Sequence, residues 1–461
     1  MKRSSGILLP VFSLPSNYGC GSLGKEAYNF INFLVEAKQT YWQMLPINHV
    51  GYGNSPYYCY SSFAGNPALI DLDLLKEDGM LDGFDLDSLD FGSDLTRVNY
   101  EKVNALKSKA LHYAFEHRNI FEEFENFKNE NSRWLKPYAE FMAKKDNDES
   151  EYHEFVQFIF YKQWYALKKY ANDNGIKLIG DVPVYVPLDS ADVMAEPEFF
   201  MLDEKNVPIE VAGVPPDYFN EEGQLWGNPL YNWEAMKNDG YGWWIRRMDG
   251  TLKLFDVVRM DHFRGFDSYW AVPYGETNAI NGHWVQGPGI EFVHIMTSWF
   301  GQDKFIAEDL GILSESVRNL LRDSGLPGMR VLEFAFTKDK TSSYLPYRYD
   351  HNCICYTGTH DNAPVMAWVK EADEEDLAFA REYCNCINED MNWGMIKVGM
   401  ASVADLFVAQ MQDYLGLDEK SRTNTPGTVG GNWEWRLKKD EASKELAKRI
   451  ALLTENYGRA R

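Results

Sequence analysis

The chain has 461 residues, enough for three average domains or for a single barrel with long insertions. Its 46 Lys and Arg residues are outnumbered by 69 Asp and Glu residues, which gives a formal net charge of -23. Because nucleic-acid binding depends on clustered Lys and Arg, this charge argues against a nucleic-acid partner and favours a neutral or cationic ligand. The composition, 45% hydrophobic and 25% charged, is that of a folded globular protein.

No stretch of the sequence is long and apolar enough to span a membrane, and the apolar run before Pro10 is too short for a signal peptide. The six cysteines are too few for a disulfide scaffold. Cys353 with Cys355 and Cys384 with Cys386 leave zinc binding open, although this spacing is not that of common structural zinc sites. We therefore expect a soluble cytoplasmic protein with free thiols and no contact with a membrane.

Eight short apolar runs recur along the chain, and most of them end in polar residues. They are residues 7–12, 41–47, 176–181, 255–261, 305–309, 329–336, 354–361 and 404–411. Continuous apolar runs of this length are typical of strands buried on both faces of a parallel sheet, although residues 404–411 would also fit a helix. Amphipathic segments at 25–38 and 315–321 predict helices between the strands.

This alternation of strands and helices predicts a (β/α)8 TIM barrel with helical and loop insertions, in which residues 1–461 form a single catalytic barrel. The residues after the eighth run are too few for a C-terminal β-domain. Residues 71–174, which include a helical pattern at 151–170, predict a helical insertion subdomain between strands 2 and 3. Residues 188–250 are rich in Pro, Gly, Asn and Trp and predict an insertion between strands 3 and 4. This insertion forms either a loop over the active site or a surface loop with no part in the site.

Three acids stand at the ends of three predicted strands: Asp261, Glu308 and Asp361. In a barrel the strand ends meet at one face, so these carboxylates would converge on one cleft. Two carboxylates flanking a bond are what glycoside chemistry needs, because one protonates the leaving oxygen and the other stabilises or attacks the anomeric carbon.

The residues by themselves leave two other interpretations open. Asp, Glu and His in a barrel mouth could hold a magnesium or zinc ion. The carboxylates could instead form structural ion pairs with Arg259, Arg264 or Arg330.

Residues 259–265 (RMDHFRG), 307–311 (AEDLG) and 358–362 (GTHDN) together resemble the 4-α-glucanotransferases of glycoside hydrolase family 77, which include the amylomaltases and disproportionating enzymes. The likeness runs the length of the chain. It includes residues 55–57, 63–67, 180–181, 214–219, 226–231, 281–285, 326–329, 426–428 and 432–433.

The resemblance implies that Asp261 is the nucleophile that forms a covalent glucosyl-enzyme intermediate. It implies that Glu308 is the general acid and base, and that Asp361 grips and distorts the donor sugar. The pKa of Glu308 should then be raised by partial burial and by the other two acids. Arg259 would stabilise the negative charge of Asp261, and Trp226 would contact sugar from a loop at residues 213–233. The substrate-binding residues implied are Tyr57, Asp181, Trp226, Asn228, Arg259, His262, His360 and Asn432.

The activity implied is the transfer of α-1,4-glucan segments from a donor malto-oligosaccharide to the 4-hydroxyl of an acceptor glucan or glucose, with no cofactor and no metal. An α-amylase-like retaining hydrolase and a non-catalytic glucan-binding protein are the alternatives. Ala363 and Pro364 stand where relatives often carry a polar residue, which leaves the acceptor-side contacts open.

Overall fold

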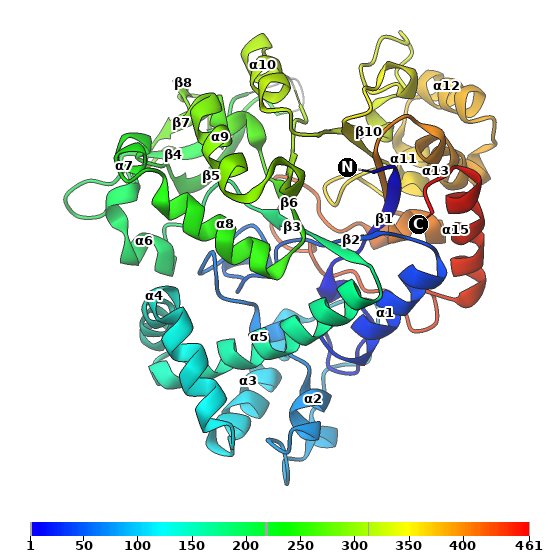
Figure 1. Ribbon diagram of the computed structural model, residues 1–461. Coiled ribbons are helices and arrows are strands. Elements are labelled where there is room, and N and C mark those ends of the chain that lie inside the picture. Colours follow the sequence, from blue (N-terminus) through cyan, green and yellow to red (C-terminus); the bar gives the residue numbers. More distant parts are fainter. Residues whose placement is uncertain (1, 217–219, 312, 461) are drawn as a thin grey trace.

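The computed structural model describes residues 2–216, 220–311 and 313–460. In this part of the chain, eight parallel strands form one sheet in the order β10-β11-β12-β1-β2-β3-β6-β9 (Figure 1). The strands are β1 (Ser4–Leu8), β2 (Tyr41–Gln43), β3 (Lys177–Val182), β6 (Val257–Met260), β9 (Phe305–Ala307), β10 (Gly328–Val331), β11 (Cys353–Tyr356) and β12 (Leu406–Gln410). The backbone N–H of Ala307 donates to the carbonyl of Pro327 at 2.9 Å, which brings the two ends of the sheet together. The fold is a nearly closed (β/α)8 barrel, as predicted.

Each of the eight predicted apolar runs overlaps one strand, and residues 404–411 hold a strand, β12, followed by the start of a short helix. Most of the strands end before their runs do. The run at 7–12 leaves the sheet after Leu8, because Pro10 has no N–H to donate and residues 11–13 turn into a 3-10 helix. The run at 329–336 likewise ends at Val331 and continues as a 3-10 helix.

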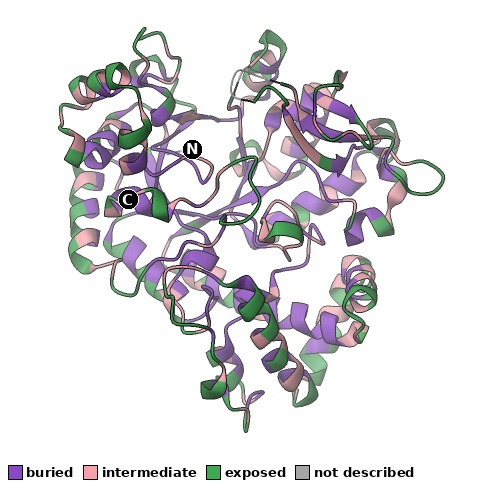
Figure 2. Cartoon of the chain, turned by 180° about the vertical axis from the view of Figure 1, so that it is seen from behind, coloured by how far each residue is buried: buried purple, intermediate pink, exposed green. Residues whose placement is uncertain are grey.

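The barrel interior is filled by one or two apolar side chains from every strand. They are Leu8, Tyr41, Ile179, Val257, Ile306, Met329, Val331, Ile354, Tyr356, Leu406 and Val408. A second, larger cluster lies between the strands and the surrounding helices. In Figure 2 the barrel strands are largely buried, whereas the outer faces of the helices are exposed.

The α-helices of the described residues are α1 (Lys25–Glu36), α2 (Leu72–Glu77), α3 (Tyr100–Glu116), α4 (Phe121–Asp146), α5 (Ser150–Asp173), α6 (Ala191–Ala195), α7 (Trp233–Asn238), α8 (Gly242–Leu254), α9 (Gly289–Phe300), α10 (Glu315–Ser324), α11 (Val365–Glu371), α12 (Glu374–Cys384), α13 (Met391–Ala401), α14 (Met411–Leu415) and α15 (Lys444–Asn456). The predicted helical patterns at residues 25–38, 151–170 and 315–321 correspond to α1, α5 and α10. Residues 71–174 hold α2 to α5. Helix α5 packs against α4 on one side and against α1 and β3 on the other, so it also covers the barrel.

Residues 188–250 contain regular elements that the sequence did not predict. Strands β4 (Glu210–Val214) and β5 (Gln224–Pro229) pair with β7 (Ser268–Pro273) and β8 (His283–Gln286), which follow β6, in an antiparallel sheet of order β5-β4-β7-β8. The insertion at residues 188–250 therefore contains more regular structure than its Pro- and Gly-rich composition indicates. Asp217, Tyr218 and Phe219, part of the motif at 214–219, lie outside the described residues.

None of the helices in the described ranges is long and apolar enough to cross a membrane. The six cysteines are free thiols, and Cys20, Cys59, Cys353 and Cys355 are buried.

Candidate active site

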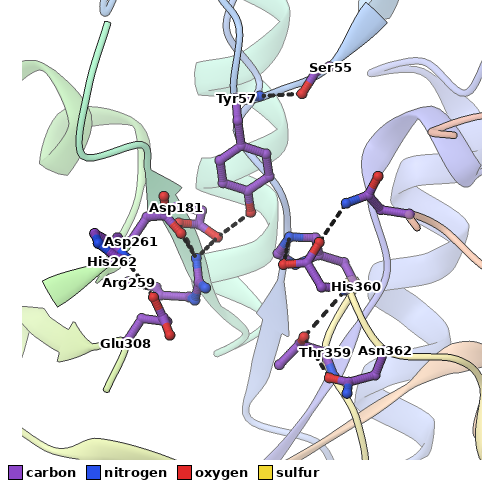
Figure 3. Close-up of polar contacts among 12 residues, drawn as sticks. Ser55, Tyr57, Asp181, Arg259, Asp261, His262, Glu308, Thr359, His360 and Asn362 are labelled. Atoms are coloured by element: carbon purple, nitrogen blue, oxygen red, sulfur yellow. Dashed lines mark hydrogen bonds and ion pairs between the residues drawn. The ribbon is translucent and has the colours of Figure 1, made fainter. Parts of the chain in front are cut away.

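Arg259, on β6, lies between two carboxylates at the carboxyl ends of neighbouring strands (Figure 3). Its Nη1 atom is 2.7 Å from Oδ2 of Asp181 and 3.1 Å from Oδ1 of Asp261. The hydroxyl of Tyr57 donates to the same Asp181 oxygen at 2.8 Å. The Asp181 side chain is only 1% exposed whereas that of Asp261 is 23% exposed, so Asp261 is the carboxylate that a ligand can reach.

Backbone hydrogen bonds hold the first two predicted acids beyond the ends of their strands. The N–H of Asp261 donates to the carbonyl of Val182 at 3.1 Å, and the N–H of Glu308 donates to the carbonyl of Met260 at 3.1 Å. Both acids therefore continue the ladder of the barrel sheet and are fixed by its most rigid part.

Both carboxylate oxygens of Glu308 accept backbone hydrogen bonds. Its Oε2 accepts from the N–H of His262 at 2.7 Å, and its Oε1 accepts from the N–H of Leu310 at 2.9 Å. Burial raises the pKa of Glu308 to about 8; Arg259 and these two hydrogen bonds oppose the rise, and Asp261 adds to it. The shift has the expected direction, and burial is its main cause.

Asp361 follows β11 and is held by partners from two segments. Its Oδ1 accepts from Nδ2 of Asn424 at 2.6 Å, and its Oδ2 lies 3.2 Å from Nε2 of His360. Burial raises the pKa of Asp361, but His360, Asn424 and the more distant Arg259 outweigh burial and lower it to about 2. With this low pKa the carboxylate is ionised, and because the side chain is 42% exposed a ligand can reach it.

The turn that carries Asp361 is tied down by residues that sequence reasoning missed. The N–H of Asn424 donates to the carbonyl of His360 at 3.1 Å, and Nη2 of Arg422 donates to the carbonyl of Asp361 at 3.2 Å. Within the turn, the backbone N–H and the hydroxyl of Thr359 both donate to Oδ1 of Asn362 at 2.9 Å. Arg422 and Asn424 follow no apolar run and resemble ordinary loop residues, so no local signal marked them.

An aromatic contact joins the Arg259 cluster to the Asp361 turn. The rings of Tyr57 and His360 stack with centroids 5.2 Å apart and an interplanar angle of 16°. Trp433 packs against both rings, at 5.9 Å and 6.0 Å. Because the Tyr57 hydroxyl also bonds to Asp181, the two halves of the site form one connected group (Figure 3).

The remaining predicted substrate-binding residues lie on β5, directly after Asp261 and in the loop that follows Asn424. Trp226, on β5, meets His262 edge to face at 4.9 Å, and Asn228 is buried on the same strand. Asn432 accepts from the N–H of Thr425 at 2.9 Å and donates to the carbonyl of Thr428 at 3.1 Å. The Asn432 amide therefore shapes the loop next to Asn424.

The open alternatives can be compared with this geometry. Asp309, next to Glu308, is buried and pairs with Arg330 at 2.9 Å, so one acid of the motif at 307–311 does form a structural ion pair. Asp261 is paired yet accessible, and the carboxylate of Glu308 is held by backbone N–H groups. Over residues 2–216, 220–311 and 313–460, no three His, Cys, Asp or Glu side chains are grouped so as to hold a metal ion.

Comparisons with known proteins show the family of the chain. The family model described as 4-alpha-glucanotransferase matches residues 9–150 and 142–442. The 4-alpha-glucanotransferase of Streptococcus pneumoniae is 42% identical, over 99% of this chain and 98% of its own length. That of Synechocystis is 43% identical, over 99% and 98%.

A solved structure, the amylomaltase from Streptococcus agalactiae in complex with acarbose, is 36% identical and superimposes with a TM-score of 0.96 over 100% of both chains. The amylomaltase from Corynebacterium glutamicum, 19% identical with a TM-score of 0.81 over 98% of this chain and 75% of its own, shares the fold. With a matching family model and relatives above 40% identity along its whole length, this chain belongs to the 4-α-glucanotransferases of glycoside hydrolase family 77.

Proposed function

We propose that the enzyme moves segments of α-1,4-glucan between chains by a retaining double displacement through a covalent glucosyl-enzyme intermediate. Asp261 attacks the anomeric carbon while Glu308 protonates the departing glucan oxygen. Glu308 then takes the proton of the acceptor 4-hydroxyl as that oxygen attacks the intermediate. The observation that carries the proposal is the pairing of an accessible carboxylate beside Arg259 with a carboxyl group whose pKa is about 8.

The two central acids have opposite protonation requirements, and their surroundings fit them. The general acid must carry a proton near neutral pH, and the raised pKa of Glu308 provides one. The nucleophile must carry a negative charge, and the guanidinium of Arg259 lies 3.1 Å from Asp261. Neither role needs a metal or an organic cofactor.

The other predicted residues bind and orient the sugar. Asp361, ionised and accessible, accepts hydrogen bonds from sugar hydroxyls and favours the distorted ring of the transition state. The rings of Tyr57 and Trp226, both partly exposed, offer aromatic surface to the pyranose faces. His360 is 3% exposed and acts by stacking on Tyr57. Asp181, almost fully buried, acts by holding Arg259 and Tyr57 in place.

The substrate class follows the family. Its members are named for transfer of 4-α-linked glucan, and the similar amylomaltase from Streptococcus agalactiae is in complex with acarbose. We therefore take malto-oligosaccharides, longer α-1,4-glucans and glucose as the partners. The six free cysteines fit a reducing compartment, and we place the enzyme in the cytoplasm.

One incubation tests the activity. Pure maltotriose should yield glucose and a ladder of longer oligomers, while the total of reducing ends stays nearly constant. A steep rise in reducing ends would show a hydrolase. An unchanged substrate would show a protein that only binds glucans.

A further inference from the structure

A fully buried carboxylate outside the catalytic group joins the two ends of the segment that carries Asp361. Oδ2 of Asp413, on α14, accepts from the hydroxyl of Thr357 at 2.5 Å. Its Oδ1 accepts from the backbone N–H of Val365 at 2.8 Å. Thr357 precedes the turn and Val365 begins the helix after it, so one side chain holds both ends of residues 357–365.

This carboxylate has no cationic partner in direct contact among the described residues. Glu333, after β10, is a second buried acid nearby, and burial together with Asp413 raises its pKa well above the usual range. Burial and Asp413 also raise the pKa of Tyr414. Both neighbours are therefore uncharged at neutral pH. Arg422, from the loop beside the turn, acts electrostatically on Glu333.

The backbone of the segment is packed closely against the same group. A side chain on Gly358 would place its Cβ 2.8 Å from Oε1 of Glu333 and 3.1 Å from Nε2 of Gln410. These two polar atoms are buried and have no hydrogen-bond partner in the described structure. The segment therefore has little room to shift. Asp413 holds its two ends, whereas Asn424 and Arg422 hold its middle.

We propose that Asp413 is a positioning residue for the transfer reaction, whose ionised carboxylate clamps residues 357 and 365 and so places Asp361 against the donor sugar. Hydrogen bonds to an ionised acceptor are shorter and about twice as strong as those between neutral groups. A misplacement of about 1 Å can reduce turnover by about 100-fold, so a clamp on this segment controls the rate without touching substrate.

Protonation should weaken the clamp. The pKa of Asp413 is about 6, raised by burial and lowered by its bonds to Thr357 and Val365. A protonated carboxyl can still accept a hydrogen bond from the N–H of Val365 through one oxygen. Its other oxygen carries the proton and donates toward Thr357, so neither hydrogen bond involves a charged group any longer. Turnover should therefore rise from a lower to a higher level as pH increases through about 6.

The variant Asp413→Asn tests this inference, because an amide reproduces the hydrogen bonding of the protonated acid. We expect kcat/KM for maltotriose to be about 10-fold below wild type at pH 7.5 and within about twofold of wild type at pH 5. Asp413→Ala, which removes both bonds, should reduce kcat/KM by about 100-fold relative to wild type at pH 7.5. At pH 5 the reduction should be smaller, about 10- to 20-fold, because wild type is itself slower there. Circular dichroism and thermal unfolding at each pH check that the variants are folded.

Asp192→Asn is the matched control, since Asp192 is also a buried carboxylate with a raised pKa but bonds to the backbone N–H of Ser62, far along the chain from residues 357–365. The ratio of kcat/KM for Asp192→Asn to that for wild type should be the same at pH 5 and pH 7.5. A ratio of Asp413→Asn to wild type that is the same at pH 5 and pH 7.5 would overturn the inference. So would an Asp413→Ala variant that is folded and fully active. The inference rests on the proposed function, and failure of that function is seen separately, as wild-type enzyme that does not redistribute maltotriose.

Discussion

The backbone N–H of His262 donates to Oε2 of Glu308 at 2.7 Å. His262 directly follows Asp261, so the segment that presents the proposed nucleophile also orients the proposed general acid. Its φ of +47° places it in the left-handed region, which few residues other than glycine adopt. The chain accepts this strained conformation where one residue connects the two reacting groups.

Substitution of either central acid should stop transfer without removing the site. Glu308→Gln should lower kcat by about 10² to 10⁴-fold, because the amide cannot protonate the leaving oxygen, and Asp261→Asn should lower it at least as much. Calorimetric titration with maltoheptaose should still show binding by both variants. The neighbouring Asp309→Asn serves as a contrast, because loss of its ion pair with Arg330 should lower the unfolding temperature and not abolish chemistry. Near-normal turnover by either active-site variant would refute its assigned role.

The rate should fall on the alkaline side as Glu308 loses its proton. The protonated form is the active general acid, so activity should be present below the pKa of about 8 and lost as pH rises through it. A profile of kcat/KM for maltotriose between pH 5 and 10 measures this directly. Asp361, with a pKa of about 2, should not titrate in this range. An activity that is constant up to pH 10 would contradict the assignment of Glu308.

Tyr57 has two functions that two variants separate. Tyr57→Phe keeps the ring stacked on His360 but removes the 2.8 Å hydrogen bond to Asp181, and a bond to a charged acceptor contributes about 1.5–3 kcal/mol. We expect kcat/KM to drop by about 10-fold or more. Tyr57→Ala also removes the stacked ring and should lose more, chiefly through weaker binding. Equal losses in both variants would show that the ring contributes nothing beyond its hydroxyl.

Asn424→Ala tests a residue that the sequence did not single out. Its amide donates to Asp361 at 2.6 Å, so its loss should leave that carboxylate free to rotate and reduce kcat/KM by about 10-fold. Asn352→Ala removes an exposed hydrogen bond from the side-chain amide to the carbonyl of Gly325. This variant is the control for a general effect on stability. If both variants have the same kinetics as wild type, Asn424 does not position Asp361.

Much of the barrel and the acids at its mouth could be predicted because both have local signatures. An apolar run marks a strand buried on two faces, and a charged residue directly after it marks the exposed strand end. Asp261 and Glu308 have this pattern, and in the structure the backbone hydrogen bonds of the barrel sheet extend to both residues. The second sheet has no such signature: β7 and β8 are half-exposed and lie among Gly and Pro residues.

The supports of the site were missed for a different reason. Asn424 and Asp413 contact the Asp361 turn from segments more than 40 residues further along the chain. Neither contact is visible without the fold, because a polar residue in a loop or at a helix start is usually a cap or a solvated side chain. Asp181 was expected to bind sugar, but its near-complete burial points to a supporting role that only the packing reveals.

The pairing of β4 with β7 ties together two connections that leave the barrel after different strands. Trp226 lies on β5 in the first connection, and β5 belongs to the same sheet as β7 and β8 of the second connection. An insertion or deletion in either connection would therefore be transmitted to the other through the shared ladder. Among related enzymes the lengths of these two connections should therefore change together more often than separately.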